Sequence, residues 1–169
     1  MKTILIEDDL DKAAGILRAG GLAAVPTETV YGLAANGLSS EAVAKIYEVK
    51  GRPETKPISL LVSGMDDVEA LCEDIPESAY TLAACFWPGP LTMILHRKPV
   101  VPDVVSAGGT TVGVRCPAHE KTLAIIKKAG VPLAAPSANL SGEPSPKNAQ
   151  RVLEYFNNKI DCVDRKSVV

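Results

Sequence analysis

Three cationic side chains lie within seven residues of one another in a segment punctuated by glycine and proline. They are Lys50, Arg52 and Lys56, with Gly51, Pro53 and Pro57 between and after them. Arginine presents a planar fork of N–H donors and lysine a mobile point charge, so such a cluster suits a clamp for phosphate or carboxylate. A solvated turn would carry the same charges, and this segment alone leaves both interpretations open.

Hydroxyl and amide side chains follow a short apolar run at residues 133–135. Ser137 and Asn139 come first, and Ser141 and Ser145 follow. Serine and asparagine are common turn formers, which is the simpler interpretation of the Ser137-Ala138-Asn139 segment. Together with a lone Arg115 at the end of another apolar run, however, these groups suit the orientation of a phosphate or a ribose.

A third polar segment, Thr27-Glu28-Thr29, follows the apolar run that ends at Pro26. Threonine and glutamate are favoured in a first helical turn, so the segment is a candidate cap for a helix beginning near Val30. Contact with a substrate is an equal alternative. The two roles are compatible, because a helix N-terminus presents free N–H groups to an anion.

The elements that must position these groups alternate along the chain. Apolar runs predict strands, and amphipathic spacing predicts helices, one of them capped by Asp8 or Asp9 and another by Ser40. The expected strands span residues 3–6, 22–25, 58–62, 91–95, 111–115, 133–135 and 160–163. The expected helices span residues 10–17, 41–49, 66–72, 77–86, 120–129 and 148–156. This alternation predicts a single α/β domain over residues 1–169, with a mixed sheet and flanking helices.

Composition narrows the classes of function. The formal net charge is −2, which argues against a chain-wide affinity for nucleic acid or an anionic membrane. The four cysteines form no C-x-x-C pair and the two histidines are far apart, so no protein-bound metal centre is expected. P-loop, G-x-G-x-x-G and G-x-S-x-G motifs are missing. With neither a signal-peptide pattern nor a long apolar stretch, we expect a cytoplasmic protein that makes no membrane contact.

Taken together and in order, the motifs resemble the YrdC/TsaC-like family of L-threonylcarbamoyladenylate synthases. They read PTETVYGLA from Pro26, KGRP from Lys50, KP at Lys56, TVGVR from Thr111 and APSANLSGEPSP from Ala135. Each motif is weak alone, but the full set at this spacing is specific, and the resemblance extends from about Ile4 to Phe156. It implies a twisted α/β fold with a mixed sheet and a concave, cationic cavity.

The resemblance also implies an activity and a set of site residues. ATP, L-threonine and bicarbonate would give threonylcarbamoyl-AMP and pyrophosphate, with Mg²⁺ accompanying the ATP. Threonine would lie near Thr29 and Arg115, and Lys50 and Arg52 would be catalytic. The residues that would bind ATP are Lys50, Arg52, Lys56, Thr111, Ser137, Asn139 and Ser145. A downstream threonylcarbamoyl transferase complex would use the product to modify tRNA next to the anticodon, and weak RNA contact is a further expectation.

Two positions depart from the family pattern. Many members carry a histidine where this chain has Leu61, and members usually continue through a further Ser/Thr-rich strand after the position of Lys166. The sequence therefore predicts a domain shortened at its C-terminus. The alternative function is a non-catalytic RNA- or nucleotide-binding module, in which the same cationic concavity would bind phosphates without turnover.

Overall fold

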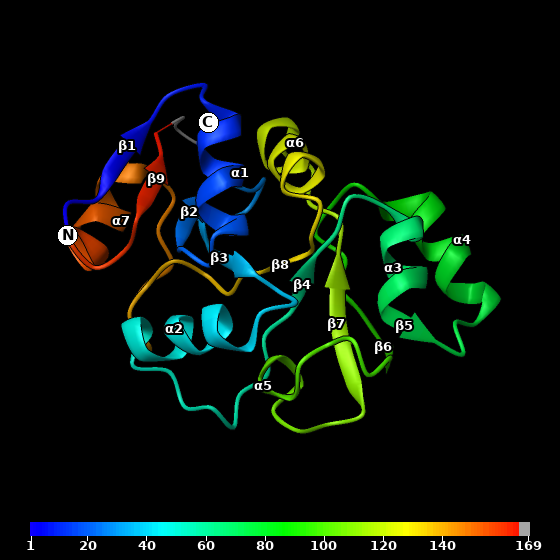
Figure 1. Cartoon of the computed structure of the whole chain (residues 1–169). Coiled ribbons are helices and arrows are strands. Elements are labelled where there is room, and N and C mark those ends of the chain that lie inside the picture. The colour runs from blue at the N-terminus through cyan, green and yellow to red at the C-terminus, as the bar shows by residue number, and fades with distance from the viewer. Residues whose placement is uncertain (166–169) are drawn as a thin grey trace.

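The computed structural model describes residues 1–165, and the four residues from Lys166 onward lie outside the description. Strands and helices alternate along the chain, and the strands form one mixed sheet with helices on both faces (Figure 1). The strands are β1 (Ile4–Ile6), β2 (Ala23–Val25), β3 (Gly32–Asn36), β4 (Leu60–Leu61), β5 (Cys72–Glu73), β6 (Met93–Arg97), β7 (Thr111–Arg115), β8 (Leu133–Ala134) and β9 (Cys162–Asp164). The helices are α1 (Leu10–Arg18), α2 (Ser40–Lys50), α3 (Met65–Leu71), α4 (Glu77–Phe86), α5 (Asp103–Ser106), α6 (Glu120–Ala129) and α7 (Ala149–Phe156).

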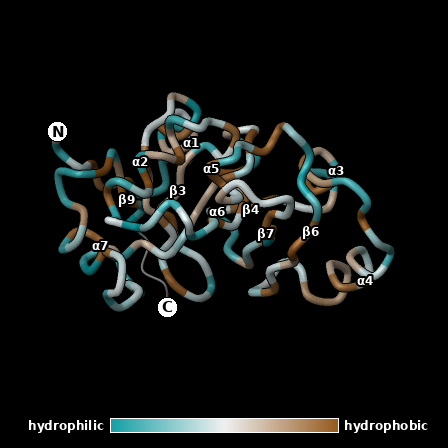
Figure 2. The backbone as a smooth tube through the Cα atoms, turned by 90° about the horizontal axis from the view of Figure 1, so that it is seen from below, coloured by the Kyte–Doolittle hydropathy of each residue, from teal (hydrophilic) through white to brown (hydrophobic). Residues whose placement is uncertain are grey.

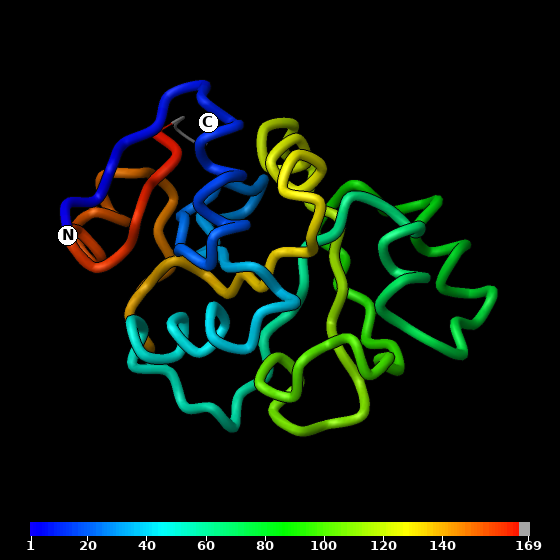
Figure 3. Tube along the Cα trace, viewed as in Figure 1, coloured from blue at the N-terminus to red at the C-terminus, as the bar shows by residue number. Residues whose placement is uncertain are grey.

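The nine strands lie in the order β1-β9-β2-β3-β8-β4-β7-β6-β5. Strands β1, β9 and β2 are parallel to one another, as are β4 and β7, and the other neighbouring pairs are antiparallel. The predicted α/β fold with a mixed sheet is therefore confirmed. The two ends of the chain meet in this sheet, because β1 pairs with β9 through Ile4 and Cys162 (Figure 3).

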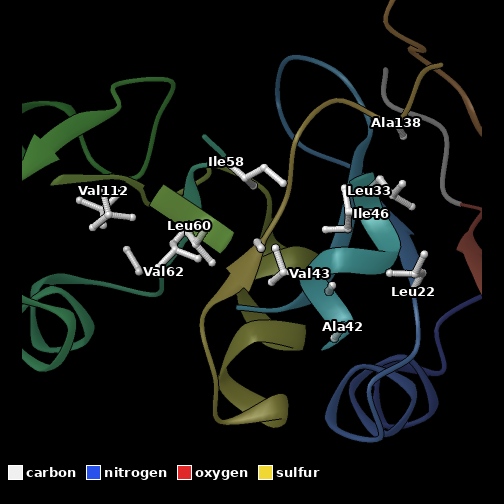
Figure 4. Packing of buried hydrophobic residues seen from close by; sticks show 14 of the residues in the cluster. Leu22, Leu33, Ala42, Val43, Ile46, Ile58, Leu60, Val62, Val112 and Ala138 are labelled. Carbon is white, nitrogen blue, oxygen red and sulfur yellow. The ribbon is translucent and has the colours of Figure 1, made fainter. Parts of the chain in front are cut away.

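Two buried apolar clusters hold the helices to the sheet. The larger includes Val43 and Ile46 of α2, which pack with Leu33 of β3 and Leu60 of β4 (Figure 4). The smaller lies under α1 and α6 and includes Leu17, Ile125 and Leu133. In Figure 2 hydrophobic stretches are visible at α3, α5 and β7. Helices α1, α2 and α6 thus bury the apolar stripes that their sequences predict, whereas α4 leaves Leu82 and Phe86 exposed.

Several predicted elements have the expected bounds, and two predictions were wrong. Strand β7, helix α4 and helix α6 match the predicted ranges. The N-cap of α2 is Ser39, whose side chain accepts the N–H of Ala42, and not Ser40. The segment after Thr29 leads into strand β3 and not into a helix from Val30. Strand β3 is placed by its pairing with β2 and β8, which outweighs the local capping signal.

Candidate functional site

One face of the central sheet carries partly exposed small or polar side chains next to buried apolar ones. Val112 and Val114 of β7 are buried in the larger cluster. Thr111 and Arg115, the first and last residues of the strand, are half-buried. Successive strand side chains point to opposite faces, so Thr111, Gly113 and Arg115 share the second face. A Cβ added at Gly113 would lie 2.6 Å from the Ser59 Oγ. Glycine at this position therefore lets Ser59 pack closely against β7.

Arg115 and Thr29, the predicted threonine-binding pair, lie side by side. The Arg115 Nη2 is 3.4 Å from the Thr29 Oγ1, and its Nε donates to the Gly89 carbonyl at 3.2 Å. The same Nη2 pairs with the carboxylate of Glu28, whose other oxygen accepts the Ala118 N–H at 2.5 Å. Burial lowers the pKa of Arg115, but a guanidinium stays protonated in proteins.

The turn before β3 holds Thr29 at the surface. The buried Thr27 hydroxyl donates to the Val30 carbonyl at 2.6 Å and accepts the N–H of Thr29 at 3.2 Å and that of Val30 at 3.3 Å. The Thr27 and Thr29 hydroxyls are 3.0 Å apart. This hydrogen-bonded turn leaves Thr29 exposed beside Arg115. Threonine is thus favoured here by the turn itself and not by helix capping.

Lys50 is buried, and its ammonium donates hydrogen bonds to the loop that follows β8. Only 3% of the residue is exposed, and the Nζ donates to the Ser137 and Asn139 carbonyls at 2.5 Å each. The Lys50 carbonyl in turn accepts the Ser141 N–H at 2.9 Å. Burial and the charge of Arg52 lower the pKa of Lys50 to about 8. The structure therefore brings Lys50, Ser137 and Asn139 together, through backbone carbonyls of the loop.

Arg52 and Lys56 lie in the loop after α2. Gly51 caps the C-terminus of this helix and has the left-handed conformation that glycine favours. Arg52 is half-buried and donates to the Pro57 carbonyl at 2.9 Å, while Lys56 is exposed. The Tyr47 hydroxyl donates to the Lys56 carbonyl at 2.8 Å. These contacts fix the backbone of the loop and leave the Lys56 charge at the surface.

The loop that carries Ser145 is held at several points along its backbone. The Asn139 side-chain amide donates to the Glu143 carbonyl at 2.8 Å, and the Tyr155 hydroxyl donates to the Pro144 carbonyl at 3.1 Å. Ser145 itself is exposed. The buried Asn139 Oδ1 accepts no hydrogen bond within the described residues.

Thr111 and Leu61 stand apart from these groups. Thr111 starts β7 opposite His96, about 13 Å along the strand from Arg115 at its end. Leu61 pairs with Arg115 in the sheet but is only 3% exposed, in the apolar cluster that includes Ile125 and Ile126. The position at which family members carry histidine is therefore part of the core under α6.

The sequence singles out Glu28 only as part of the Thr27-Glu28-Thr29 segment, and its ion pair with Arg115 was not predicted. A lone arginine at a strand end beside a polar segment is the sequence feature that points to such a carboxylate partner. Within residues 1–165, no group of three or more His, Cys, Asp and Glu side chains could hold a metal ion. No helix in this range is long and apolar enough to cross a membrane.

Comparison with known proteins identifies the family. A Sua5/YciO/YrdC family model, described as telomere recombination, matches residues 15–166. A threonylcarbamoyl-AMP synthase of Pyrococcus abyssi is 51% identical over 89% of this chain and 44% of its own length. One from Bacillus subtilis is 46% identical over 91% of this chain and 45% of its own. The chain thus spans less than half the length of these two relatives.

The solved structures agree with this result. The crystal structure of Pyrococcus abyssi Sua5 complexed with L-threonine has a TM-score of 0.94 and 45% identity. That match covers 99% of this chain and 51% of the solved one. The family model covers most of the chain, and the fold agrees with a solved member throughout. This chain belongs to the Sua5/YciO/YrdC family.

Proposed function

We propose that this chain forms threonylcarbamoyl-AMP and pyrophosphate from L-threonine, bicarbonate and ATP, and so acts as a nucleotidyltransferase in tRNA modification. One observation carries the proposal. Thr29 and Arg115 lie side by side on the open sheet face, in a fold shared with a relative that was solved with L-threonine. A guanidinium beside a hydroxyl suits the carboxylate and the hydroxyl of that amino acid.

The proposed reaction needs no covalent intermediate on the protein. The threonine amine attacks bicarbonate and water leaves, which gives a carbamate. A carbamate oxygen then attacks the α-phosphate of ATP and expels pyrophosphate. Positioning of the two reactants, and cations that face the charge developing at phosphorus, supply the catalysis.

The cationic residues divide into two roles in this proposal. Arg52 and Lys56 meet the phosphates, because their loop lies at the surface and Lys56 is exposed. Lys50 is buried and holds the backbone of Ser137 and Asn139, so it orients the ATP-binding loop. Ser137, Asn139 and Ser145 then contact the nucleotide. Thr111 is the outermost residue of the proposed ATP site.

We place Mg²⁺ with the triphosphate and not in a protein cage. The loops at residues 50–57 and 137–145 carry one glutamate each, Glu54 and Glu143, and are otherwise rich in lysine, arginine and hydroxyl groups. Within residues 1–165 no three His, Cys, Asp or Glu side chains gather into a metal site, so the triphosphate would supply most of the ligands that Mg²⁺ requires. When bound, the ion would neutralise charge on the phosphates that Arg52 and Lys56 also face.

A downstream threonylcarbamoyl transferase would take the product to tRNA. The mixed anhydride of a carbamate and a phosphate is labile in water, so direct delivery suits its chemistry. RNA contact would be weak, since the formal net charge of the chain is −2. A non-catalytic nucleotide-binding module is the rival function, and it would bind ATP without consuming threonine.

Pyrophosphate release and mass spectrometry of the product test the proposal. Wild type should release pyrophosphate only with all three substrates and should yield threonylcarbamoyl-AMP. Arg52→Ala should lose about 100- to 1,000-fold in rate, the usual effect of removing one preorganised donor. Arg52→Lys should recover only part of the rate, because a point charge does not reproduce a bidentate fork.

Two results would contradict these expectations. Equal pyrophosphate release without threonine would refute the synthase, and ATP binding without turnover would favour the non-catalytic module. Thermal melts of the Arg52 variants are the control for folding. Arg52 is half-buried and bonded to a single loop, so the melting temperature should change little.

A further inference from the structure

We propose that Glu28 is a positioning residue that holds the Arg115 guanidinium in the orientation needed to receive the carboxylate of the amino-acid substrate. This role rests on the proposed function and deepens it. Glu28 lies in the segment between β2 and β3, and Arg115 ends β7, so two distant parts of the chain meet at this pair.

The Glu28 carboxylate is itself fixed in place. Its Oε1 pairs with the Arg115 Nη2, and its Oε2 accepts the Ala118 N–H at 2.5 Å. Ala118 lies in the segment that connects β7 to α6, three residues after Arg115. A carboxylate tied to a backbone amide has little freedom to follow a moving guanidinium, so it defines where the guanidinium must lie.

Arg115 is held from two sides and keeps one nitrogen for a ligand. The Gly89 carbonyl takes the Nε–H at 3.2 Å, and Glu28 takes the Nη2. Within residues 1–165 the Nη1 makes no hydrogen bond or ion pair. The two Nη2 hydrogens face Glu28 and Thr29, so of the five N–H donors of a guanidinium the two on Nη1 are left for a second carboxylate beside Thr29.

Burial makes this arrangement effective. The Arg115 side chain is 16% exposed and the Glu28 side chain 23%, so water screens the pair less than it screens a surface pair. A flexible arginine would have to lose rotamer freedom when the substrate binds. With Glu28 and Gly89 in place, that freedom is already lost in the folded protein, which favours binding.

The test measures the affinity for L-threonine by calorimetry for wild type and Glu28→Gln. Glutamine keeps one oxygen for the Ala118 N–H but loses the charge that holds Arg115. The dissociation constant for threonine should rise about tenfold or more, in line with the loss of a hydrogen bond to a charged group. The constant for ATP should stay within about twofold, because the Lys50 loop is untouched.

A double-mutant cycle separates positioning from a general structural effect. In an Arg115→Lys background, Glu28→Gln should change threonine affinity little, because the group that Glu28 positions is gone. Glu28→Asp, which keeps the charge with a shorter reach, should fall between wild type and Glu28→Gln. If Glu28→Gln does not fold, Glu28→Asp takes its place in the affinity measurement.

Asp103→Asn is the matched control. Asp103 pairs with Arg97, which, like Arg115, also donates to backbone carbonyls, here those of Val101 and Gly109. Breaking this second pair should leave threonine affinity unchanged.

Three outcomes would overturn the role of Glu28. Threonine binding by Glu28→Gln that equals or exceeds wild type would mean that Glu28 competes with the substrate or plays no part. Equal losses in the wild-type and Arg115→Lys backgrounds would mean a structural effect. A wild type that binds no threonine would refute the proposed function, and the role of Glu28 with it, whereas the first two outcomes leave the proposed function standing.

Discussion

Lys50 shows how one side chain can serve the fold and the site at once. It is the last residue of α2, its aliphatic stem is buried, and its ammonium bonds two carbonyls of the loop after β8. A charge at this depth is tolerated because the Ser137 and Asn139 carbonyls accept hydrogen bonds from it. Its effect on a nucleotide would therefore pass through the positions of Ser137 and Asn139.

Replacing Lys50 and Lys45 on the same helix tests this difference. Lys50→Met removes the donor to the Asn139 carbonyl and leaves the Ser137 carbonyl with the Asn139 N–H alone, so the free energy of unfolding should fall by about 1–3 kcal/mol and ATP affinity should drop at least about tenfold. Lys45 donates to a single carbonyl, that of Gly20, at an exposed site. Lys45→Met should therefore change stability by less than about 0.5 kcal/mol and leave ATP affinity intact. Urea unfolding and calorimetry measure both, and equal effects of the two variants would contradict the anchoring role.

The lowered pKa of Lys50 predicts opposite pH dependences for the free energy of unfolding and for ATP affinity. Its pKa is lowered from 10.5 to about 8, so between these values the unfolded chain binds the proton that the folded chain has released. The contribution of Lys50 to the free energy of unfolding should therefore rise with pH in this window. In the folded protein the ammonium that bonds the loop is lost as the pH rises through about 8, so ATP affinity should fall there.

ATP titrations from about pH 7 to about pH 9, in parallel with urea unfolding, measure both signs for wild type and Lys50→Met. In Lys50→Met, neither the rise in the free energy of unfolding nor the fall in ATP affinity that Lys50 causes should be seen. An ATP affinity of wild type that stays constant across this range would show that loop anchoring does not depend on the charge.

At the scale of elements, Gly113 of β7 allows β7 to pack closely against the residues next to β4 and β6. Gly113→Ala would place a Cβ 2.6 Å from the Ser59 Oγ and 3.2 Å from the Thr92 Cγ2. Overpacking of this kind costs about 1–3 kcal/mol, so urea unfolding should show that loss. Ser59→Ala in the same chain should restore part of it, because the nearest atom is removed.

The matched control for Gly113→Ala is Gly15→Ala in helix α1. A Cβ at Gly15 meets nothing within 4 Å, so alanine should stabilise the helix, by up to about 1 kcal/mol. Gly113→Ala with the stability of wild type would mean that strands β4 and β7 separate easily, and the open face would then be less rigid than its contacts imply.

How far the sequence predicts each element depends on where its stabilisation comes from. Helix α6 was predicted to the residue because its apolar spacing and Gly130 cap are local signals. Strand β3 was missed because Gly32-Leu33-Ala34-Ala35-Asn36 has little strand propensity of its own. It is a strand because β2 and β8 flank it.

The candidate site shows the same division. The helical stripe of α2 predicts that Lys50 lies with Val43 and Ile46, and burial agrees. Its bonds to Ser137 and Asn139, and the contact of Glu28 with Arg115, join residues about 90 positions apart. Contacts of that separation depend on the order of the strands, which no local pattern encodes. The roles assigned to the site residues, and the cationic cavity, remain predictions.

At the scale of the molecule, a mixed sheet was predictable but its strand order was not. All nine strands have five residues or fewer, and several pair with strands far along the chain. The order brings together Arg115 at the end of β7, Thr29 in the segment before β3, and the loop after β8 that Lys50 contacts. The site is therefore a property of the whole sheet and not of one motif.

The place of β9 between β1 and β2 has a consequence for synthesis on the ribosome. Strand β1 emerges first, yet the strand that it pairs with, through Ile4 and Cys162, is translated after every other element of the sheet. Strands β1 and β2 therefore lack their shared partner β9 until nearly the whole domain has been synthesised. An abrupt stop in translation before Cys162 would leave a nascent chain with an open, apolar gap at β1 and β2, a ready substrate for chaperones and proteases.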